Sequence, residues 1–189
     1  MNKVNVYDFD KTIIPYDSTQ QFIRFLLRRK PSLIFSLAPR ALALGIYAIK
    51  IISKTRAKEI VYGFLKNVPD INSEVKLFWE QSFGDINLWY INSKKADDII
   101  ISASPDFLLR PVAEKLNVRL IASLVNSKTG KTTGENCYGA QKVIRLNAEY
   151  PGTDISEFYS DSLSDSPLAE LSDKAFLVSG SEITPWPAN

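Results

Sequence analysis

The sequence predicts an α/β fold in which a parallel sheet receives an all-helical insertion after its first strand. An apolar, strand-like run stands near the start of the chain, at residues 3–7. The long block that follows, residues 16–91, has apolar residues at helical spacing and no strand pattern. Beyond residue 96, strand-like and helix-like segments alternate, which is typical of a parallel sheet. We therefore expect a discontinuous core, residues 1–15 and 92–189, and a helical cap formed by residues 16–91.

The middle block divides into several helices at its proline residues and turns. Ser18 is a candidate N-cap for the first helix, and Pro31 ends that helix. The following segment, residues 31–52, is strongly apolar, but Pro39 and Lys50 interrupt it. It therefore predicts a helical hairpin rather than a membrane-spanning helix. The helices expected in the cap cover residues 18–29, 32–38, 40–53, 56–65 and 73–91.

The second half of the chain supplies the remaining strands and helices of the core. A continuous apolar run that ends at Ser102 is typical of a buried parallel strand. Pro105 suits the first turn of the helix that follows, and residues 128–131 predict a turn. The strands expected here cover residues 97–102, 118–125, 155–160 and 175–178, and the helices cover residues 105–116, 140–146 and 167–171.

The amino-acid composition limits the classes of protein to which the chain can belong. The 189 residues, 45% hydrophobic and 23% charged, suit one soluble globular domain or a core with one insertion. The chain has no histidine, which excludes a Ser-His-Asp triad, a Cys-His pair and a histidine-ligated zinc. The single Cys137 excludes an internal disulfide. Residues 1–4 lack the basic-then-apolar pattern of a signal peptide, so we expect a reducing, cytoplasmic location.

The charge of the chain is unevenly distributed. The net charge is +2, but the stretch from Ser18 to Lys58 holds nine basic residues and no acidic residue. The chain has 23 basic residues in total, so 14 basic residues lie outside this stretch. All 21 acidic residues lie outside it as well. This asymmetry favours an anionic partner or substrate near the basic stretch, and a solvated helical face explains it equally well.

Polar residues follow three of the expected strands. Asp8 and Asp10 come directly after the first strand and project to the same side of the backbone. Two carboxylates this close are costly unless a hard divalent cation and a phosphoryl group compensate them, and the alternative is an aspartate-rich turn. In open parallel sheets, ligands bind at the carboxyl ends of strands. The residues at these ends, with a lysine on an intervening helix, are Asp8, Asp10, Ser102, Ala103, Ser104, Lys142, Asp161 and Asp165, and all of them except Ala103 are polar.

These residues resemble the motifs of a known superfamily. The string from Asp8 to Thr12 matches the DxDxT signature of the haloacid dehalogenase-like superfamily. The order of this signature, a strand-terminal serine, a lysine and an acidic pair resembles the four motifs of its Rossmann-like core. The helical insertion and the string from Ser102 to Pro105 are similar to the phosphoserine-phosphatase-like branch.

The resemblance implies roles for individual residues. Asp8 would be the nucleophile that becomes an aspartyl-phosphate, and also a metal ligand. Asp10 would act as general acid and base, with its backbone carbonyl on the metal. Lys142 would hold the nucleophile and the phosphate. Asp161 would ligate Mg²⁺, and Asp165 would orient metal-bound water or Lys142.

The resemblance also implies substrate contacts at Thr12, Asp17 and residues 102–104. Ser102 would donate to a phosphoryl oxygen. Asp17 lies where this branch commonly has an acidic residue near the substrate, and it would meet an amine or simply cap the next helix. Many phosphoserine phosphatases have Ser-Gly-Gly at residues 102–104, and the family often has glycines where this chain has Ser160 and Ser162. The first departure weakens a specific assignment to phosphoserine.

The expected function is therefore that of a Mg²⁺-dependent phosphomonoesterase that acts on a small phosphorylated metabolite. The presence of Asp10 favours phosphoryl chemistry over dehalogenation, because dehalogenases of the superfamily lack the second aspartate. The basic, apolar cap leaves open a phospholipid head-group phosphatase similar to phosphatidylglycerophosphate phosphatases, with peripheral membrane contact. A phosphotransferase and a non-catalytic module that binds phosphate esters are further alternatives. The expected partner is a small-molecule phosphate ester and not a nucleic acid.

Overall fold

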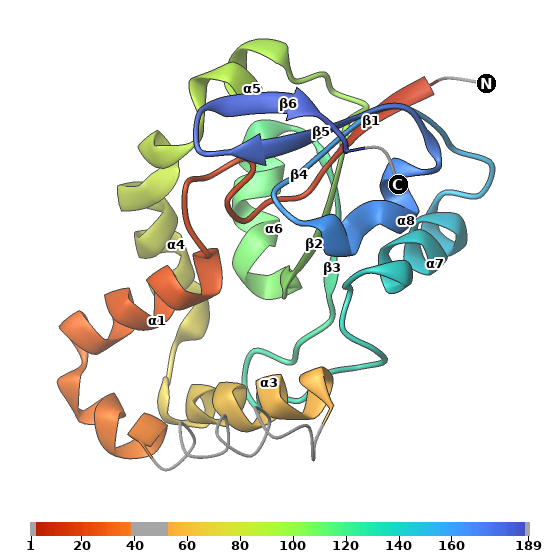
Figure 1. The fold of residues 1–189 in the computed structure, drawn as a ribbon. Helices are drawn as coiled ribbons and strands as arrows, with labels where there is room; N and C mark the ends of the chain where they lie inside the picture. The colour runs from red at the N-terminus through yellow and green to blue at the C-terminus, as the bar shows by residue number, and fades with distance from the viewer. Residues whose placement is uncertain (1–2, 39–52, 188–189) are drawn as a thin grey trace.

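The core of the protein is a six-stranded sheet with the order β3-β2-β1-β4-β5-β6 (Figure 1). The computed structural model describes residues 3–38 and 53–187. The first five strands are parallel, and β6 pairs antiparallel with β5. The strands are β1 Lys3–Tyr7, β2 Ile99–Pro105, β3 Arg119–Ser123, β4 Asp154–Ser160, β5 Ser172–Ser179 and β6 Glu182–Pro185. The predicted α/β fold with a parallel sheet is confirmed, and β6 is an addition that the sequence pattern did not indicate.

The order in which strands are added to the sheet reverses at β1, in the middle of the sheet. After β1, the strands β2 and β3 are added on one side, and β4 and β5 on the other. The carboxyl ends of β1 and β4 therefore border a topological switch point, which is where open parallel sheets bind ligands. Asp8 follows β1 and Asp161 follows β4, so the fold brings two predicted site residues to this point.

Both faces of the central strands are buried. Val6 belongs to the hydrophobic cluster on the side of α7 (Ala140–Glu149) and α8 (Ser166–Ala169). The next residue, Tyr7, belongs to a second cluster shared with α6 (Asp106–Leu116) and the cap helices. Successive residues of a strand point to opposite faces, so burial on both faces accounts for the continuous apolar runs in these strands.

The described residues between 16 and 91 form helices and no strand. This confirms the all-helical insertion for that part of the chain, while the predicted helix at residues 40–53 lies outside the described residues. In Figure 1, α1 and α3 lie together at one end of the sheet. No helix in the described segments is long and apolar enough to cross a membrane. The elements are α1 Ser18–Arg29, a 3₁₀ turn Pro31–Leu33 with helical residues 34–38, α3 Lys54–Tyr62, a 3₁₀ turn Gly63–Asn67, α4 Ile71–Ser82, a 3₁₀ turn Phe83–Asp85 and α5 Leu88–Ser93.

The N-cap of α1 is Asp17, and the prediction of Ser18 was wrong. The Asp17 backbone is extended, and its carboxylate accepts a hydrogen bond from the backbone N–H of Gln20 at 2.8 Å. A carboxylate at this position also meets the positive end of the helix dipole. The backbone N–H of Ser18, the first helical residue, donates instead to Asp10. The start of the cap helix is thus tied to the predicted active-site loop.

The single helix predicted at residues 73–91 is divided into α4 and α5, so that prediction was wrong. The 3₁₀ turn Phe83–Asp85 contains a glycine, the residue type that least favours a helix after proline. Asn87 then docks on the loop after β1, where its backbone N–H donates to the carbonyl of Ile13 at 2.9 Å. Its side-chain amide donates to the carbonyl of Thr12 at 2.8 Å. The break in the helix therefore lets the end of the cap support the loop that carries Asp8 and Asp10.

The loop between β3 and α7 fastens α3 to the core. Glu59 accepts two hydrogen bonds from Thr132, each 2.9 Å long, through the backbone N–H and the hydroxyl. The predicted turn is present, and Gly130 has a positive φ of 73°. A Cβ at Gly130 would lie 2.3 Å from the carbonyl oxygen of Tyr62, so the close approach requires glycine. The remaining predicted elements are present with ends shifted by a few residues.

Candidate active site

The loop after β1 presents Asp8 and Asp10 at the switch point. The backbone N–H of Asp8 donates to the carbonyl of Tyr159 in β4 at 2.8 Å, which extends the parallel pairing by one residue. The carbonyl of Phe9 then accepts hydrogen bonds from three backbone N–H groups within the next five residues, so the loop turns tightly. Lys11 has a positive φ of 56°, an uncommon conformation for a residue other than glycine. The turn holds both carboxylates at the end of the central strand.

Lys142 of α7 joins Asp8 to Asp165 through two buried ion pairs. Its Nζ lies 2.7 Å from Asp8 Oδ1 and 2.6 Å from Asp165 Oδ2, and its side chain is 2% exposed. Burial opposes the charge of the lysine, but the two carboxylates outweigh this and raise the pKa of Lys142. Burial raises the pKa of Asp8 to about 7, while the lysine acts in the opposite direction. Ser160 Oγ also donates to Asp165 Oδ2 at 2.8 Å, which fixes that carboxylate against the lysine.

Asp10 is held by a separate set of hydrogen bonds. Its Oδ1 accepts from the backbone N–H of Ser18 at 2.8 Å, and its Oδ2 accepts from the hydroxyl of Ser104 at 2.5 Å. Burial raises the pKa of Asp10 to about 6; the charge of Asp17 adds to this, and the bonds from Ser104 and Ser18 oppose it. A carboxyl group with a pKa near the working pH can both donate and accept a proton. The two aspartates therefore have different surroundings and can take different roles.

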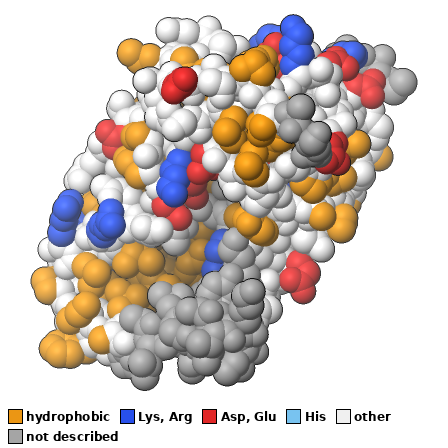
Figure 2. Space-filling model, viewed as in Figure 1, with side chains coloured by type: hydrophobic (Ala, Val, Ile, Leu, Met, Phe, Trp, Pro, Cys, Tyr) orange, Lys and Arg blue, Asp and Glu red, His pale blue; other side chains and the backbone are white. Residues whose placement is uncertain are grey.

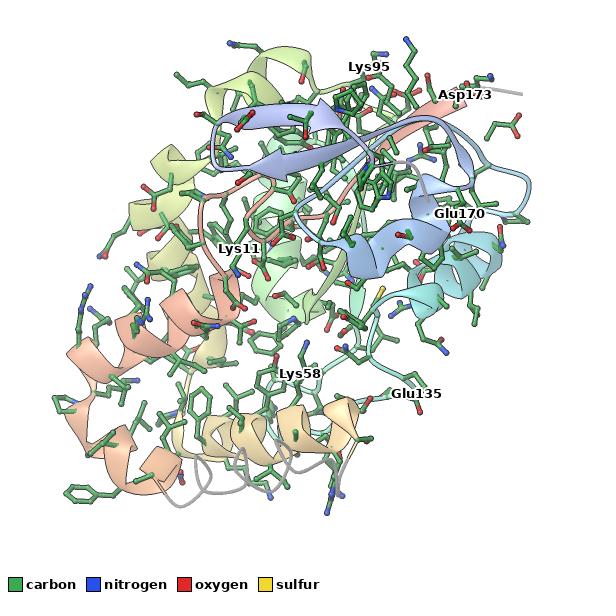
Figure 3. The ribbon with its side chains drawn as sticks, viewed as in Figure 1. Lys11, Lys58, Lys95, Glu135, Glu170 and Asp173 are labelled. Carbon is green, nitrogen blue, oxygen red and sulfur yellow. The ribbon has the colours of Figure 1, made fainter. Side chains whose placement is uncertain are left out.

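These carboxylates line a cavity of about 650 Å³ between the strand ends and the cap. Figure 2 shows charged side chains at the rim of a hollow and hydrophobic side chains on the cap side below it. Figure 3 shows Lys58 rising from α3 toward the core. The cap contributes Asp17, Thr19, Gln20, Ile23, Ala57, Lys58, Val61 and Tyr62, and the core contributes Asp8, Asp10, Lys11, Ser102, Ala103, Ser104, Tyr138, Lys142, Asp161, Ser162, Ser164 and Asp165.

The residues at the end of β2 line the cavity as expected. Ser102 Oγ accepts a hydrogen bond from the backbone N–H of Ser104 at 3.1 Å, so its own O–H can still donate to a phosphoryl oxygen. The carbonyl of Ala103 accepts from Lys58 Nζ at 2.8 Å and from Ser123 Oγ at 3.0 Å. The strand end is therefore held from the cap and from the neighbouring strand.

Two residues predicted to contact substrate have structural roles. Thr12 is fully buried and does not line the cavity. Its carbonyl accepts the amide of Asn87, so its position supports the loop. Asp17 does line the cavity, but its carboxylate caps α1. Of the two roles left open for Asp17, the structure shows the capping role.

Sequence patterns did not indicate Lys58, Thr19 or Tyr138 as lining residues of the site. Lys58 was only one of nine basic residues, and its partners, Ala103 and Asn136, lie 45 and 78 positions away in the chain. No local motif marks a residue whose neighbours come from such distances. Arg29 and Lys30 instead pair with Glu74 at 2.8 and 2.9 Å. Among the described basic residues between Ser18 and Lys58, Lys58 alone lines the cavity.

The carboxyl groups at the cavity fit a hard divalent cation. Burial raises the pKa of Asp161 as it raises that of Asp8, and the nearby lysine charges offset this effect only in part. In addition, Asp165 Oδ1 is buried without a hydrogen-bond partner in the described structure. Among the described residues, no three acidic or cysteine side chains are already arranged so that they could hold a metal ion. Mg²⁺ does not need one, because it binds through one or two carboxylates, a carbonyl, waters and a substrate phosphate.

The parallel sheet, the Asp-Lys-Asp cluster at its carboxyl edge and the helical cap define an α/β enzyme with a capped cavity. Comparison with known families agrees with this class. Residues 6–170 match the model of the haloacid dehalogenase-like hydrolases, and the chain belongs to this family.

Similar proteins and structures match most of this chain. The chain is 27% identical to Protein CicA of Caulobacter vibrioides over 89% of its own length and 82% of that protein. A protein of unknown function from Bordetella pertussis has a similar structure, with a TM-score of 0.74, 23% identity and coverage of 90% and 86% of the two chains. A phosphoserine phosphohydrolase-like protein from Francisella tularensis superposes with a TM-score of 0.58, at 18% identity and 92% and 86% coverage. The fold is therefore the one found in phosphatase-like members of the family.

Proposed function

We propose that the protein is a Mg²⁺-dependent phosphomonoesterase that acts through an aspartyl-phosphate at Asp8. The observation that carries the proposal is the Asp8–Lys142–Asp165 cluster at the floor of a cavity large enough for an organic phosphate. Membership of the hydrolase family supports it. A module that only binds phosphate esters would not need a buried carboxylate paired with a buried lysine, because two anions repel each other.

The contact with Lys142 supports a different role for each carboxylate oxygen of Asp8. Lys142 holds Oδ1, so Oδ2 is the atom that attacks phosphorus. The new Oδ2–P bond forms as the bond from phosphorus to the alcohol oxygen breaks, and Asp10 gives its proton to that oxygen. Asp10 then removes a proton from the water that attacks the aspartyl-phosphate, which releases phosphate and restores Asp8.

The surrounding residues neutralise and orient the transferred group. Lys142 and the hydroxyl of Ser102 would stabilise the phosphoryl oxygens. Asp161 and Asp8, with the carbonyl of Asp10, would hold Mg²⁺, and Asp165 orients Lys142. Bound Mg²⁺ supplies charge neutralisation for the phosphoryl group.

One observation favours a hydrophobic phosphate ester over phosphoserine. The cap wall of the cavity contains Ile23, Ala57, Val61 and Tyr62. An apolar wall of this kind would bind a hydrocarbon part of the substrate. A phospholipid head-group phosphatase is therefore the second candidate, and it requires salt-sensitive binding to anionic vesicles. A small polar metabolite, by contrast, would require no binding to vesicles.

The experiment that tests the proposal compares the wild-type protein with Asp8→Asn. The wild type should release inorganic phosphate from an aryl phosphate when Mg²⁺ is present, and Asp8→Asn should lose at least about 10³-fold of this rate. Asp97→Asn, at an exposed position outside the cavity, is the control. Retention of more than a few per cent of the rate by folded Asp8→Asn would overturn the proposed role. Transfer of phosphate to an added alcohol in place of its release would indicate a phosphotransferase.

A further inference from the structure

The hydroxyl of Ser104 stands at the centre of a hydrogen-bond network that links the cap to Asp10. Its Oγ lies 2.5 Å from Asp10 Oδ2, 3.1 Å from Thr19 Oγ1 and 3.3 Å from Ser18 Oγ. A hydroxyl has one proton and two lone pairs. Since Ser104 donates its proton to the carboxylate, it must accept from Thr19 and Ser18. The direction of all three bonds follows from this count.

We propose that Ser104 is the positioning residue that holds Asp10 in place as the general acid, and that Ser18 and Thr19 hold Ser104 in turn. The proposal rests on the proposed phosphatase function. Asp10 receives two bonds from different directions, one to each carboxylate oxygen. These bonds restrict rotation of the side chain, so the carboxyl group stays at the position where the leaving oxygen departs.

The two donors to Ser104 strengthen its bond to Asp10. A hydroxyl that accepts hydrogen bonds becomes a better donor, because bonds in a chain polarise one another. Ser104 is 4% exposed and Ser18 is fully buried, so water competes little with these contacts. Both donors belong to the first turn of α1. The cap therefore supports the acid directly, in addition to forming the wall of the cavity.

The test compares two phosphate esters whose alcohols differ in acidity. The alkoxide that leaves ethyl phosphate needs a proton from Asp10, whereas the phenolate that leaves 4-nitrophenyl phosphate is stable without one. The value of kcat/KM reports the steps up to departure of the alcohol and is insensitive to later hydrolysis of the aspartyl-phosphate. Ser104→Ala should lower kcat/KM for ethyl phosphate by about 10-fold or more, and for 4-nitrophenyl phosphate by about 2-fold or less.

Matched variants separate positioning from folding. Ser104→Thr keeps the hydroxyl and should restore most of the rate with ethyl phosphate. Thr19→Val removes one donor to Ser104 while it keeps the shape, and it should show a smaller loss with the same preference for the ethyl ester. Ser93→Ala removes an exposed hydroxyl in α5 and should change neither rate.

The outcomes distinguish this proposal from the one on which it rests. Equal losses with both esters, in Ser104→Ala and in Thr19→Val, would mean that the network is only structural. Wild-type rates with both esters would also overturn the positioning role. A wild-type protein that hydrolyses neither ester in the presence of Mg²⁺ would overturn the phosphatase function itself, and the positioning role with it.

Discussion

Lys142 and Asp8 form a buried ion pair, with Nζ 2.7 Å from Oδ1, and the same ammonium group also neutralises Asp165. Loss of the lysine would leave two buried carboxylates without a cation. Lys142→Met should therefore lower the free energy of unfolding by about 3 kcal/mol or more at neutral pH. It should also abolish phosphate release. Denaturant unfolding measures the first effect, with Lys128→Met at an exposed position as the control. An unchanged free energy of unfolding would show that the pair is not a structural element.

Mg²⁺ should stabilise the folded protein as well as activate it. A ligand that binds only the folded state adds about 3 kcal/mol at a concentration a hundredfold above its Kd. The melting temperature should rise with added Mg²⁺, and excess chelator should remove both this rise and the turnover. Asp161→Asn should reduce the rise, whereas the exposed Asp97→Asn should keep it. Undiminished turnover in chelator would contradict the proposed cofactor.

Glu74 should make stability depend on pH within the cap. Burial disfavours its charge, but Lys30 and Arg29 outweigh burial and lower its pKa from the ordinary value of 4.5. A lowered pKa means that the stabilisation is fully present above pH 4.5 and is lost as the pH falls through the lower folded-state value. Glu74→Gln should therefore cost up to about 1 kcal/mol at pH 7, a small value because solvent screens the half-exposed Arg29, and the difference from wild type should vanish in acid. Glu80→Gln on the same helix should show no such change, and a pH-independent effect of Glu74→Gln would contradict this account.

The sheet and the main carboxylates could be predicted from the sequence because local rules determine them. A buried parallel strand appears as a continuous apolar run, and its end is marked by polar residues such as Asp8 and Ser102. Parallel strands carry these ends to one edge, so the sequence alone indicated which side chains would meet. The structure places Lys142 between Asp8 and Asp165, and it does so from a helix whose position follows from the same alternation of strands and helices.

The supporting contacts could not be predicted because they join distant parts of the chain. Ser104 and Asp10 are 94 positions apart, and Asn87 and Thr12 are 75 apart. Neither contact has a pattern within its own segment. The helix predicted across residues 73–91 failed for the same reason, since docking of Asn87 on a distant loop outweighs local helical spacing.

The apolar cap wall should control the choice of substrate through Val61. This residue lines the cavity, so a hydrocarbon chain attached to the phosphate would pack against it. Val61→Asn should raise KM for octyl phosphate by about 10-fold, because one apolar contact of this size is worth about 1–3 kcal/mol. KM for ethyl phosphate should change little, since that ester has the same alcohol chemistry but cannot reach the wall. Ile144→Asn in α7, where the side chain is 56% exposed and lies outside the cavity, should leave both values unchanged. Equal changes for the two esters, or a higher kcat/KM for phosphoserine than for octyl phosphate, would favour a small polar substrate.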